Sequence, residues 1–260
     1  YKIERKERAK NVKCVIVTVG NEKVLPSLID VVSQMRRLGL DYVIVSSNRL
    51  QFDNVIVVPR EEDGNKYKAI KYFVKNFVRD DYWYVFFDDD SYPEDDGFLY
   101  DIAYFSKDSR YAIGNGILKP RPGKSKLAYA LDCIRYFDDI TRYRLAALLK
   151  KPIYGLHGEL LIVRGDVLKE IWLSMEDSIT EDFNFAMHAM KRGYKFFQSK
   201  TVVSIKSPNS IRDFIRQRKR WANVIFDSVR HRNILIPIYT ITSVVISPLF
   251  ALFWLLMHSI

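Results

Sequence analysis

Three consecutive carboxylates, Asp88, Asp89 and Asp90, directly follow a short apolar run, WYVFF, in the sequence. Carboxylates this close repel one another, and burying them without partners costs several kcal/mol. A hard divalent cation removes the repulsion by accepting carboxylate oxygens, and it keeps open positions for phosphate and water. We therefore predict that Asp88 and Asp90 bind one cation, which stabilises a departing diphosphate. The alternative is a solvated acidic turn, which further acidic residues nearby would extend.

A second acidic group, Glu181 and Asp182, follows Thr180 at the predicted start of a helix that runs to Lys191. Acidic side chains in a first helical turn are ordinary partners of the helix dipole, which is one interpretation. The other is a general base. Sugar transfer to a hydroxyl requires removal of the hydroxyl proton, and we predict that Asp182 accepts it, with a pKa tuned by burial and by Glu181. A base and a cation together suffice for single displacement with inversion.

The third group is the basic stretch from Gln217 to Trp221, QRKRW. Guanidinium groups pair with phosphate oxygens in a fork geometry. An indole provides a surface on which a sugar ring stacks, and an amide can bond to its hydroxyls. Gln217, Arg220 and Trp221 would occupy one helical turn and converge on a ligand. The alternative is an amphipathic basic helix that only contacts lipid.

The elements that position these groups are indicated by short apolar runs that alternate with helical patterns. This alternation predicts an α/β fold, Rossmann-like, with a mostly parallel sheet flanked by helices on both faces. Ligands of such sheets bind at the carboxyl ends of the strands, where the aspartate triplet stands. Strands are predicted at 12–19, 42–45, 55–58, 83–87, 111–117, 160–163 and 195–197, and helices at 24–38, 67–78, within 127–149 and at 180–191.

Composition narrows the class of protein. A chain of 260 residues with 48% hydrophobic content can bury one large core. The chain has a formal charge of +10, but its basic residues are not interleaved with a known nucleic-acid-binding motif. No nucleic-acid partner is therefore predicted. The two cysteines, Cys14 and Cys133, lack metal or redox spacing and indicate buried thiols in a reducing compartment, the cytosol.

The C-terminal part of the chain predicts membrane attachment. Residues 234–260 contain no Asp, Glu, Lys or Arg, and about 20 apolar residues cross a bilayer core of about 30 Å. Basic and apolar residues segregate on a predicted helix within 206–233, typical of a helix in the headgroup layer. We expect a catalytic domain over 1–205 on the cytoplasmic face, this interfacial region, and the start of a transmembrane helix. The alternative for the last segment is a buried helix of a soluble domain, and both ends of the chain look cut.

The three groups, in this order, resemble the motifs of family 2 glycosyltransferases with the GT-A fold. The QxxRW pattern is similar to that of the membrane-embedded branch, which includes cellulose, chitin and hyaluronan synthases. The run 179–194 (ITEDFNFAMHAMKRGY), Lys206-Ser207-Pro208 and Asp213-Phe214 look like the Egghead-type β-1,4-mannosyltransferases. The chain is expected to resemble an archaeal membrane-bound mannosyltransferase related to them.

This resemblance implies GDP-mannose as donor, Mn²⁺ or Mg²⁺ as cofactor, a lipid-linked or membrane-proximal glycan acceptor, and inversion to a β-linkage. It implies that Asp88 and Asp90 bind the metal and, with Asp89, the donor diphosphate, and that Asp182 is the base. For donor binding it also implies Thr18, Val19, Glu22, Lys68, Arg218 and Arg220, and for acceptor binding it implies Glu181, His157, Gln217 and Trp221.

Two departures from the family pattern leave other functions open. Many relatives carry an aspartate that reads uracil after the second strand, where this chain has Ser46-Ser47-Asn48. Egghead-type proteins also tend to replace part of the triplet that this chain keeps. A processive polysaccharide synthase using a UDP-sugar is the alternative enzyme, and a membrane-surface scaffold without catalysis is the alternative of another class.

Overall fold

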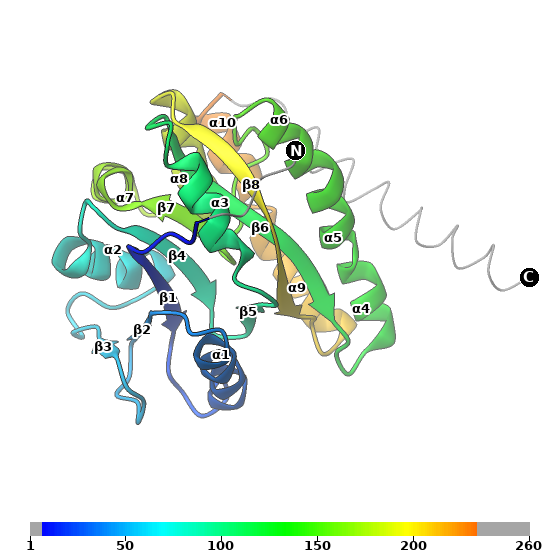
Figure 1. Cartoon of the computed structure of the whole chain (residues 1–260). Helices are drawn as coiled ribbons and strands as arrows, with labels where there is room; N and C mark the ends of the chain where they lie inside the picture. The colour runs from blue at the N-terminus through cyan, green and yellow to red at the C-terminus, as the bar shows by residue number, and fades with distance from the viewer. Residues whose placement is uncertain (1–6, 233–260) are drawn as a thin grey trace, which may run out of the picture.

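One mixed sheet organises the chain in the computed structural model, which describes residues 7–232 (Figure 1). The strand order is β3-β2-β1-β4-β7-β6-β8-β5. Strands β1 to β4 run parallel, β7 is antiparallel to both β4 and β6, and β5 is antiparallel to β8. The strands are β1 (Val12–Thr18), β2 (Tyr42–Ser46), β3 (Val55–Val57), β4 (Trp83–Asp88), β5 (Ser91–Pro93), β6 (Tyr111–Arg121), β7 (Leu161–Arg164) and β8 (Lys195–Lys206).

Helices cover both faces of this sheet (Figure 1). On one face lie α1 and α3, and on the other lie α2, α7 and α8. The helices are α1 (Leu25–Arg37), α2 (Lys66–Phe77), α3 (Gly97–Phe105), α4 (Lys126–Asp132), α5 (Ile134–Asp138), the π-helical turn η1 (Asp139–Tyr143), α6 (Arg144–Leu148), α7 (Gly165–Trp172), α8 (Glu181–Lys191), α9 (Ile211–Trp221) and α10 (Val224–Arg230).

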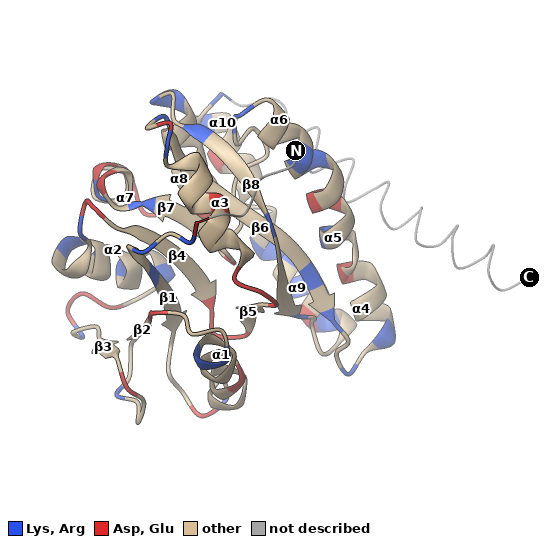
Figure 2. Ribbon diagram, viewed as in Figure 1, with Lys and Arg blue, Asp and Glu red and all other residues tan. Residues whose placement is uncertain are grey.

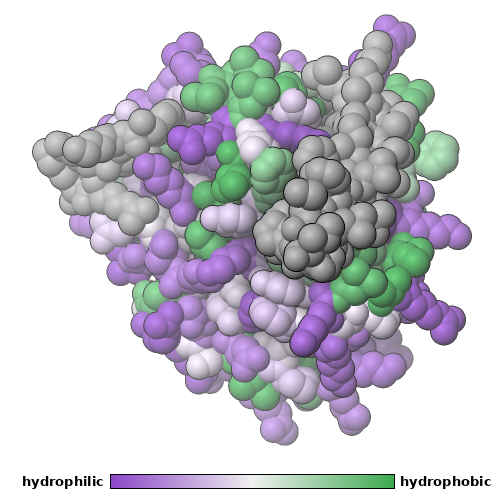
Figure 3. Space-filling view, turned by 90° about the vertical axis from the view of Figure 1, so that its right-hand side faces the viewer, coloured by the Kyte–Doolittle hydropathy of each residue, from purple (hydrophilic) through white to green (hydrophobic). Residues whose placement is uncertain are grey.

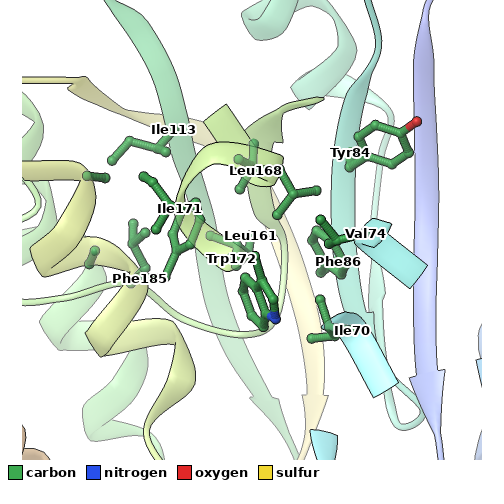
Figure 4. Close-up of a cluster of buried hydrophobic side chains, with 14 of the residues drawn as sticks. Ile70, Val74, Tyr84, Phe86, Ile113, Leu161, Leu168, Ile171, Trp172 and Phe185 are labelled. Atoms are coloured by element: carbon green, nitrogen blue, oxygen red, sulfur yellow. The ribbon is translucent and has the colours of Figure 1, made fainter. Parts of the chain in front are cut away.

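The hydrophobic core explains why the central strands are apolar along their whole length. Strand β4 is buried on both faces, with Phe86 facing one cluster and Phe87 the other. Figure 4 shows the cluster that contains Phe86 and Trp172. The Trp172 ring stacks on Phe86 and on Tyr67, at centroid distances of 6.4 and 5.9 Å. This packing holds the N-terminal part of α2 firmly over the sheet.

The predicted α/β class is confirmed, but the sheet is mixed rather than mostly parallel, because β7 and β5 run antiparallel to their neighbours. The first six elements lie within a residue or two of their expected bounds. Three elements were not predicted: β5, α3 and α7. The prediction for β8 was too short, because its second half is interrupted by polar residues. Two of these residues, Ser199 and Thr201, are nevertheless buried, and their hydroxyls donate to Asp101 and Asp95. The hydropathy pattern does not reveal a strand whose polar side chains are satisfied by distant carboxylates.

Region 206–233 contains α9 and α10, and the predicted membrane segment 234–260 lies outside the described residues. Helix α9 buries none of its residues completely. Within residues 7–232, every helix is too short or too polar to cross a bilayer. Helix α9 contacts α4, and Arg218 in the basic stretch donates to Asp132 of α4.

Candidate active site

The carboxyl ends of β1 and β4 open into one large cavity of about 1930 Å³. Its wall includes Asp88 to Asp90 after β4, Glu181 and Asp182 at the start of α8, and residues 217–221 of α9. Figure 2 shows acidic residues in red where the chain leaves β4 and basic residues in blue along α9. Three groups that lie far apart in the sequence therefore share one cavity.

The aspartate triplet is only partly neutralised by its neighbours. Asp88 Oδ1 accepts a hydrogen bond from Lys66 Nζ at 2.5 Å, and Asp89 Oδ2 accepts one from Thr18 Oγ1 at 2.6 Å. Burial and then Asp88, Asp89 and Glu159 raise the pKa of Asp90 to about 7. Both burial and the neighbouring carboxylates therefore disfavour the charged form of Asp90.

Lys66 connects the triplet to the second acidic group. Its Nζ lies 2.5 Å from Asp88 Oδ1 and 3.5 Å from Glu181 Oε1. Burial lowers the pKa of Lys66, but Asp88 and Glu181 outweigh burial and raise it, so the side chain stays charged. Gly158 leaves room for this amine, because a Cβ there would lie 2.7 Å from Lys66 Nζ and 3.9 Å from Asp182 Oδ2. The ammonium group thus lies between both carboxylate groups.

The start of α8 holds Glu181 and Asp182 in environments that favour their protonated forms. Burial raises the pKa of Glu181 to about 7, although Lys66 opposes this shift. Burial also raises the pKa of Asp182, against the opposing effects of Lys66 and the backbone amide of Phe183. A carboxylate whose pKa is moved toward neutrality accepts a proton more effectively near pH 7. Asp182 therefore has the chemistry of a general base and lines the cavity in which a hydroxyl can approach it.

A buried ion pair between Arg135 and Glu159 supports α9. Arg135 Nη2 donates to Glu159 Oε1 at 2.7 Å, and their side chains are 8% and 14% exposed. Burial raises the pKa of Glu159, but Arg135 and His157 outweigh burial and lower it to about 2. The Arg135 guanidinium also lies 4.9 Å from the centroid of the Trp221 ring. This contact therefore holds Trp221 against α5.

Some side chains of α9 pair with other parts of the protein, and others face the cavity. Arg218 donates to the fully buried Asp132 at 2.7 Å and lies over the Trp221 ring at 4.4 Å. Arg220 is exposed and lines the cavity. Gln217 Oε1 is buried and has no hydrogen-bond partner among the described residues. A buried amide oxygen of this kind is suited to accept a hydrogen bond from a ligand.

His157 also lines the cavity and lies in the segment before β7. Its Nε2 lies 2.7 Å from Asp139 Oδ1, and its ring lies 4.2 Å from that of Tyr143. Burial lowers the pKa of His157, but Asp139 outweighs it and raises the pKa. Asp139 is oriented in turn by the backbone amide of Leu118, which donates to its other oxygen at 2.5 Å.

The structure brings most of the predicted site residues together, and the two exceptions are Glu22 and Lys68. Thr18 and Val19 line the large cavity. Glu22 lines a neighbouring hollow of about 660 Å³ formed by the loops after β1 and β2. Lys68 is exposed and lies outside the lining of the large cavity. It is two residues from Lys66, the lysine that contacts the triplet, and about half a turn of α2 therefore points the two side chains in opposite directions.

Four residues of the site had no signal in the sequence: Lys66, Asp132, Arg135 and Glu159. Each contacts a partner at least 22 positions away, so spacing along the chain does not reveal the contact. Glu159 follows His157-Gly158 directly, and that neighbourhood was the one available clue.

The residues present fit a divalent cation. Among residues 7–232, no three His, Cys, Asp or Glu side chains already form a cation site. The triplet nevertheless offers carboxylate oxygens, which Mn²⁺ and Mg²⁺ prefer. Asp88 and Asp90 would hold such an ion, and its charge would offset the repulsion that, after burial, raises the pKa of Asp90.

The chain belongs to glycosyl transferase family group 2, whose sequence profile matches residues 83–260. It is 30% identical over 192 residues to the β-1,4-mannosyltransferase bre-3 of Caenorhabditis briggsae, covering 69% of this chain and 42% of that protein. It is 27% identical over 179 residues to the β-1,4-mannosyltransferase egh of Drosophila melanogaster, covering 64% of this chain and 39% of that protein. The chain thus spans about two fifths of the length of these relatives.

A solved structure with a similar fold is the mannosyltransferase PcManGT from Pyrobaculum calidifontis, in complex with GDP-Man and Mn²⁺. The two superpose with a TM-score of 0.62 over 96% of this chain and 74% of the other, at 14% sequence identity. At this identity the likeness establishes the fold, and the mixed α/β sheet fits the GT-A class.

Asp90→Asn is expected to weaken the dependence of stability on pH. The native pKa of Asp90 is about 7, against an ordinary value of 3.8, so between these values the native state binds a proton that the unfolded state lacks. This contribution to stability is fully present below the unfolded pKa and is lost as pH rises through the native pKa. Urea unfolding in EDTA at about pH 5 and about pH 8 measures the difference.

As pH rises from the lower to the higher value, the unfolding free energy of wild type should fall more than that of Asp90→Asn. Glu181 is present in both proteins, so its own titration cancels in the comparison to first order. Equal losses would show that Asp90 titrates normally in the native state.

Proposed function

We propose that this chain transfers mannose from GDP-mannose to a hydroxyl of a lipid-linked or membrane-proximal glycan acceptor, with inversion to a β-linkage. The observation that carries the proposal is the single cavity that joins Asp88 to Asp90 with Asp182 and with α9. A metal-binding group, a base and a basic cover are the parts that this reaction needs, and each is contributed by a different element.

The comparisons support the choice of sugar and donor. The relatives bre-3 and egh carry the name β-1,4-mannosyltransferase. The structure of PcManGT, which shares the fold, contains GDP-Man and Mn²⁺. Serine and asparagine after β2, in place of the aspartate that many relatives use for uracil, agree with a donor base other than uracil.

In the proposed reaction Asp182 accepts the proton of the attacking hydroxyl, which enters the cavity beside Glu181. Mn²⁺ or Mg²⁺, when bound, would offset the negative charge that develops on the diphosphate. Asp88 and Asp90 would hold the ion, and Thr18 keeps Asp89 oriented through a 2.6 Å hydrogen bond. Arg220 approaches the diphosphate from α9, while Gln217 and Trp221 border the acceptor. Lys66 remains charged beside the base and limits how far the pKa of Asp182 rises.

Asp182→Asn is expected to abolish mannose transfer while leaving donor binding nearly intact. An amide cannot take the hydroxyl proton, and loss of a general base lowers kcat by about 10²–10⁴-fold. Transfer from radiolabelled GDP-mannose into a glycolipid-containing membrane extract measures kcat, and calorimetry measures donor affinity. Asp166→Asn is the matched control, because Asp166 pairs with Arg164 away from the cavity. Normal turnover by Asp182→Asn would contradict the assignment of the base.

A donor panel tests the base and the metal together. GDP-mannose is expected to bind in the presence of Mn²⁺ and to lose most of its affinity in EDTA, because the acidic triplet repels a diphosphate without a cation. UDP-glucose and UDP-N-acetylglucosamine should bind more weakly under the same conditions. Tight binding of a UDP-sugar with no response to GDP-mannose would favour the polysaccharide-synthase alternative. Nucleotide affinity that chelation leaves unchanged would contradict metal dependence.

We also propose that the catalytic domain rests on the cytoplasmic face of a membrane. Residues 124–151 expose apolar, basic and uncharged polar side chains, whereas their acidic residues, Asp132, Asp138 and Asp139, are buried. Figure 3, which views the right-hand side of Figure 1, shows hydrophobic residues next to hydrophilic ones on this side. Anionic lipids of the cytoplasmic leaflet attract such surfaces. The exposed large apolar residues of this stretch are Leu127, Tyr136, Phe137, Ile140, Leu145, Leu148 and Leu149.

Reversing the charge of Lys150 and Lys151 together is expected to weaken binding to vesicles that contain phosphatidylglycerol. Each basic residue near such a surface contributes about 1 kcal/mol, so the double variant should bind at least tenfold more weakly. Binding to neutral phosphatidylcholine vesicles should not change. The same reversal at Lys23 and Lys107, exposed on other parts of the surface, is the control. An equal loss in both double variants would show that only net charge matters.

A further inference from the structure

A buried carboxylate on α10 contacts the loop that leads into the proposed base. Asp227 is 8% exposed, and its Oδ2 accepts hydrogen bonds from two hydroxyls of that loop. Thr180 Oγ1 donates to it at 2.5 Å, and Ser178 Oγ donates to the same oxygen. These contacts join positions nearly fifty residues apart in the chain. Hydrogen bonds to a buried charged group are among the stronger ones in proteins.

Thr180 shows that this contact replaces an ordinary helix cap. A threonine at the N-cap usually accepts a hydrogen bond from a backbone amide of the first turn. Thr180 is the N-cap residue of α8, yet its side chain makes no capping bond. Its hydroxyl donates to Asp227 instead. The first turn of α8, which carries Glu181 and Asp182, is therefore held in place from outside the helix.

Further contacts tie α10 to the same loop and helix. His231, directly after α10, has its Nε2 2.6 Å from Oδ1 of Asn184, which is buried on α8. Asn184 Nδ2 donates in turn to the backbone oxygen of Glu176. Arg230 pairs with the Glu176 side chain at 2.7 Å, but both groups are well exposed. The buried contacts of Asp227 are thus the ones that act nearest to the proposed base.

We infer that Asp227 is a positioning residue, which fixes the start of α8 so that the Asp182 carboxylate faces the acceptor hydroxyl. This inference rests on the proposed function of Asp182. The mechanism is geometric. The carboxylate of Asp227 orients two hydroxyls, these fix the backbone at Ser178 and Thr180, and that backbone sets the direction of the next two side chains. Asp227 touches no reacting atom itself.

The test compares Thr180→Val, Thr180→Ser, Asp227→Ala and Asp227→Asn with wild type. Thr180→Val keeps the shape of the side chain but removes the donor, and kcat should fall about 10- to 100-fold, since a displacement of about 1 Å suffices for such a loss. Thr180→Ser restores the hydroxyl and should recover most of kcat. Asp227→Ala should lose as much as Thr180→Val. Asp227→Asn, which still accepts hydrogen bonds but lacks the charge, should lie between Asp227→Ala and wild type.

A structural role alone would change other quantities. Positioning predicts that the KM for GDP-mannose stays near the wild-type value, and that Thr180→Val combined with Asp227→Ala loses no more than either single variant. Glu176→Gln is the matched control. Glu176 lies on the same loop, and its substitution breaks only the exposed pair with Arg230, so kcat should not change. The inference would be overturned if the losses of kcat in the two single variants added up in the double variant. It would also be overturned if Tm and the affinity for the donor fell together with kcat.

Hydrogen exchange separates failure of this inference from failure of the proposed function. Amides of residues 178–183 should exchange faster in Thr180→Val and Asp227→Ala than in wild type, and this measurement needs no donor. Absence of mannose transfer by the wild-type chain would refute the proposed function. Wild-type exchange and wild-type kcat in both variants would refute the role of Asp227.

Discussion

The repulsion among carboxylates is the constraint on which this site depends. Asp88 to Asp90 and Glu181 with Asp182 line one cavity, and Lys66 is the cation that contacts both groups. Burial is the main cause that raises the pKa values of Asp90 and Glu181 to about 7, and the neighbouring carboxylates add to it. A cationic ligand would stabilise the charged carboxylates of such a site, and burial also raises the pKa of Asp182.

The basic cover of the cavity depends on pairs that are buried elsewhere. Arg135 with Glu159 and Arg218 with Asp132 are both partly or fully removed from water, and both guanidinium groups lie near the Trp221 ring. Breaking such a pair by removing one partner leaves a buried charge and is strongly destabilising. These pairs therefore place α9 against the catalytic domain, while Arg220 and Gln217 remain available for ligands. A helix with no fully buried residue is held by electrostatic and cation–π contacts.

Helix α10, like α9, has both exposed residues and residues that bind the rest of the protein. An exposed apolar residue, Phe226, lies next to Asp227, whose buried carboxylate binds the loop before α8. One short helix thus exposes Phe226 and Val229 and buries the carboxylate of Asp227. This arrangement links the part of the chain proposed to lie at the membrane with the residues proposed to carry out the chemistry.

The sequence by itself determined the α/β class, the order of the first strands and helices, and the three groups that line the cavity. Those features depend on local patterns, such as the apolar run before Asp88. Only the tertiary structure decided that Lys66 rather than Lys68 contacts the triplet, that Arg218 is paired with Asp132, and that polar residues interrupt a buried β8. Each of these depends on a partner distant in the chain, and hydropathy and spacing carry no information about which buried charge meets which.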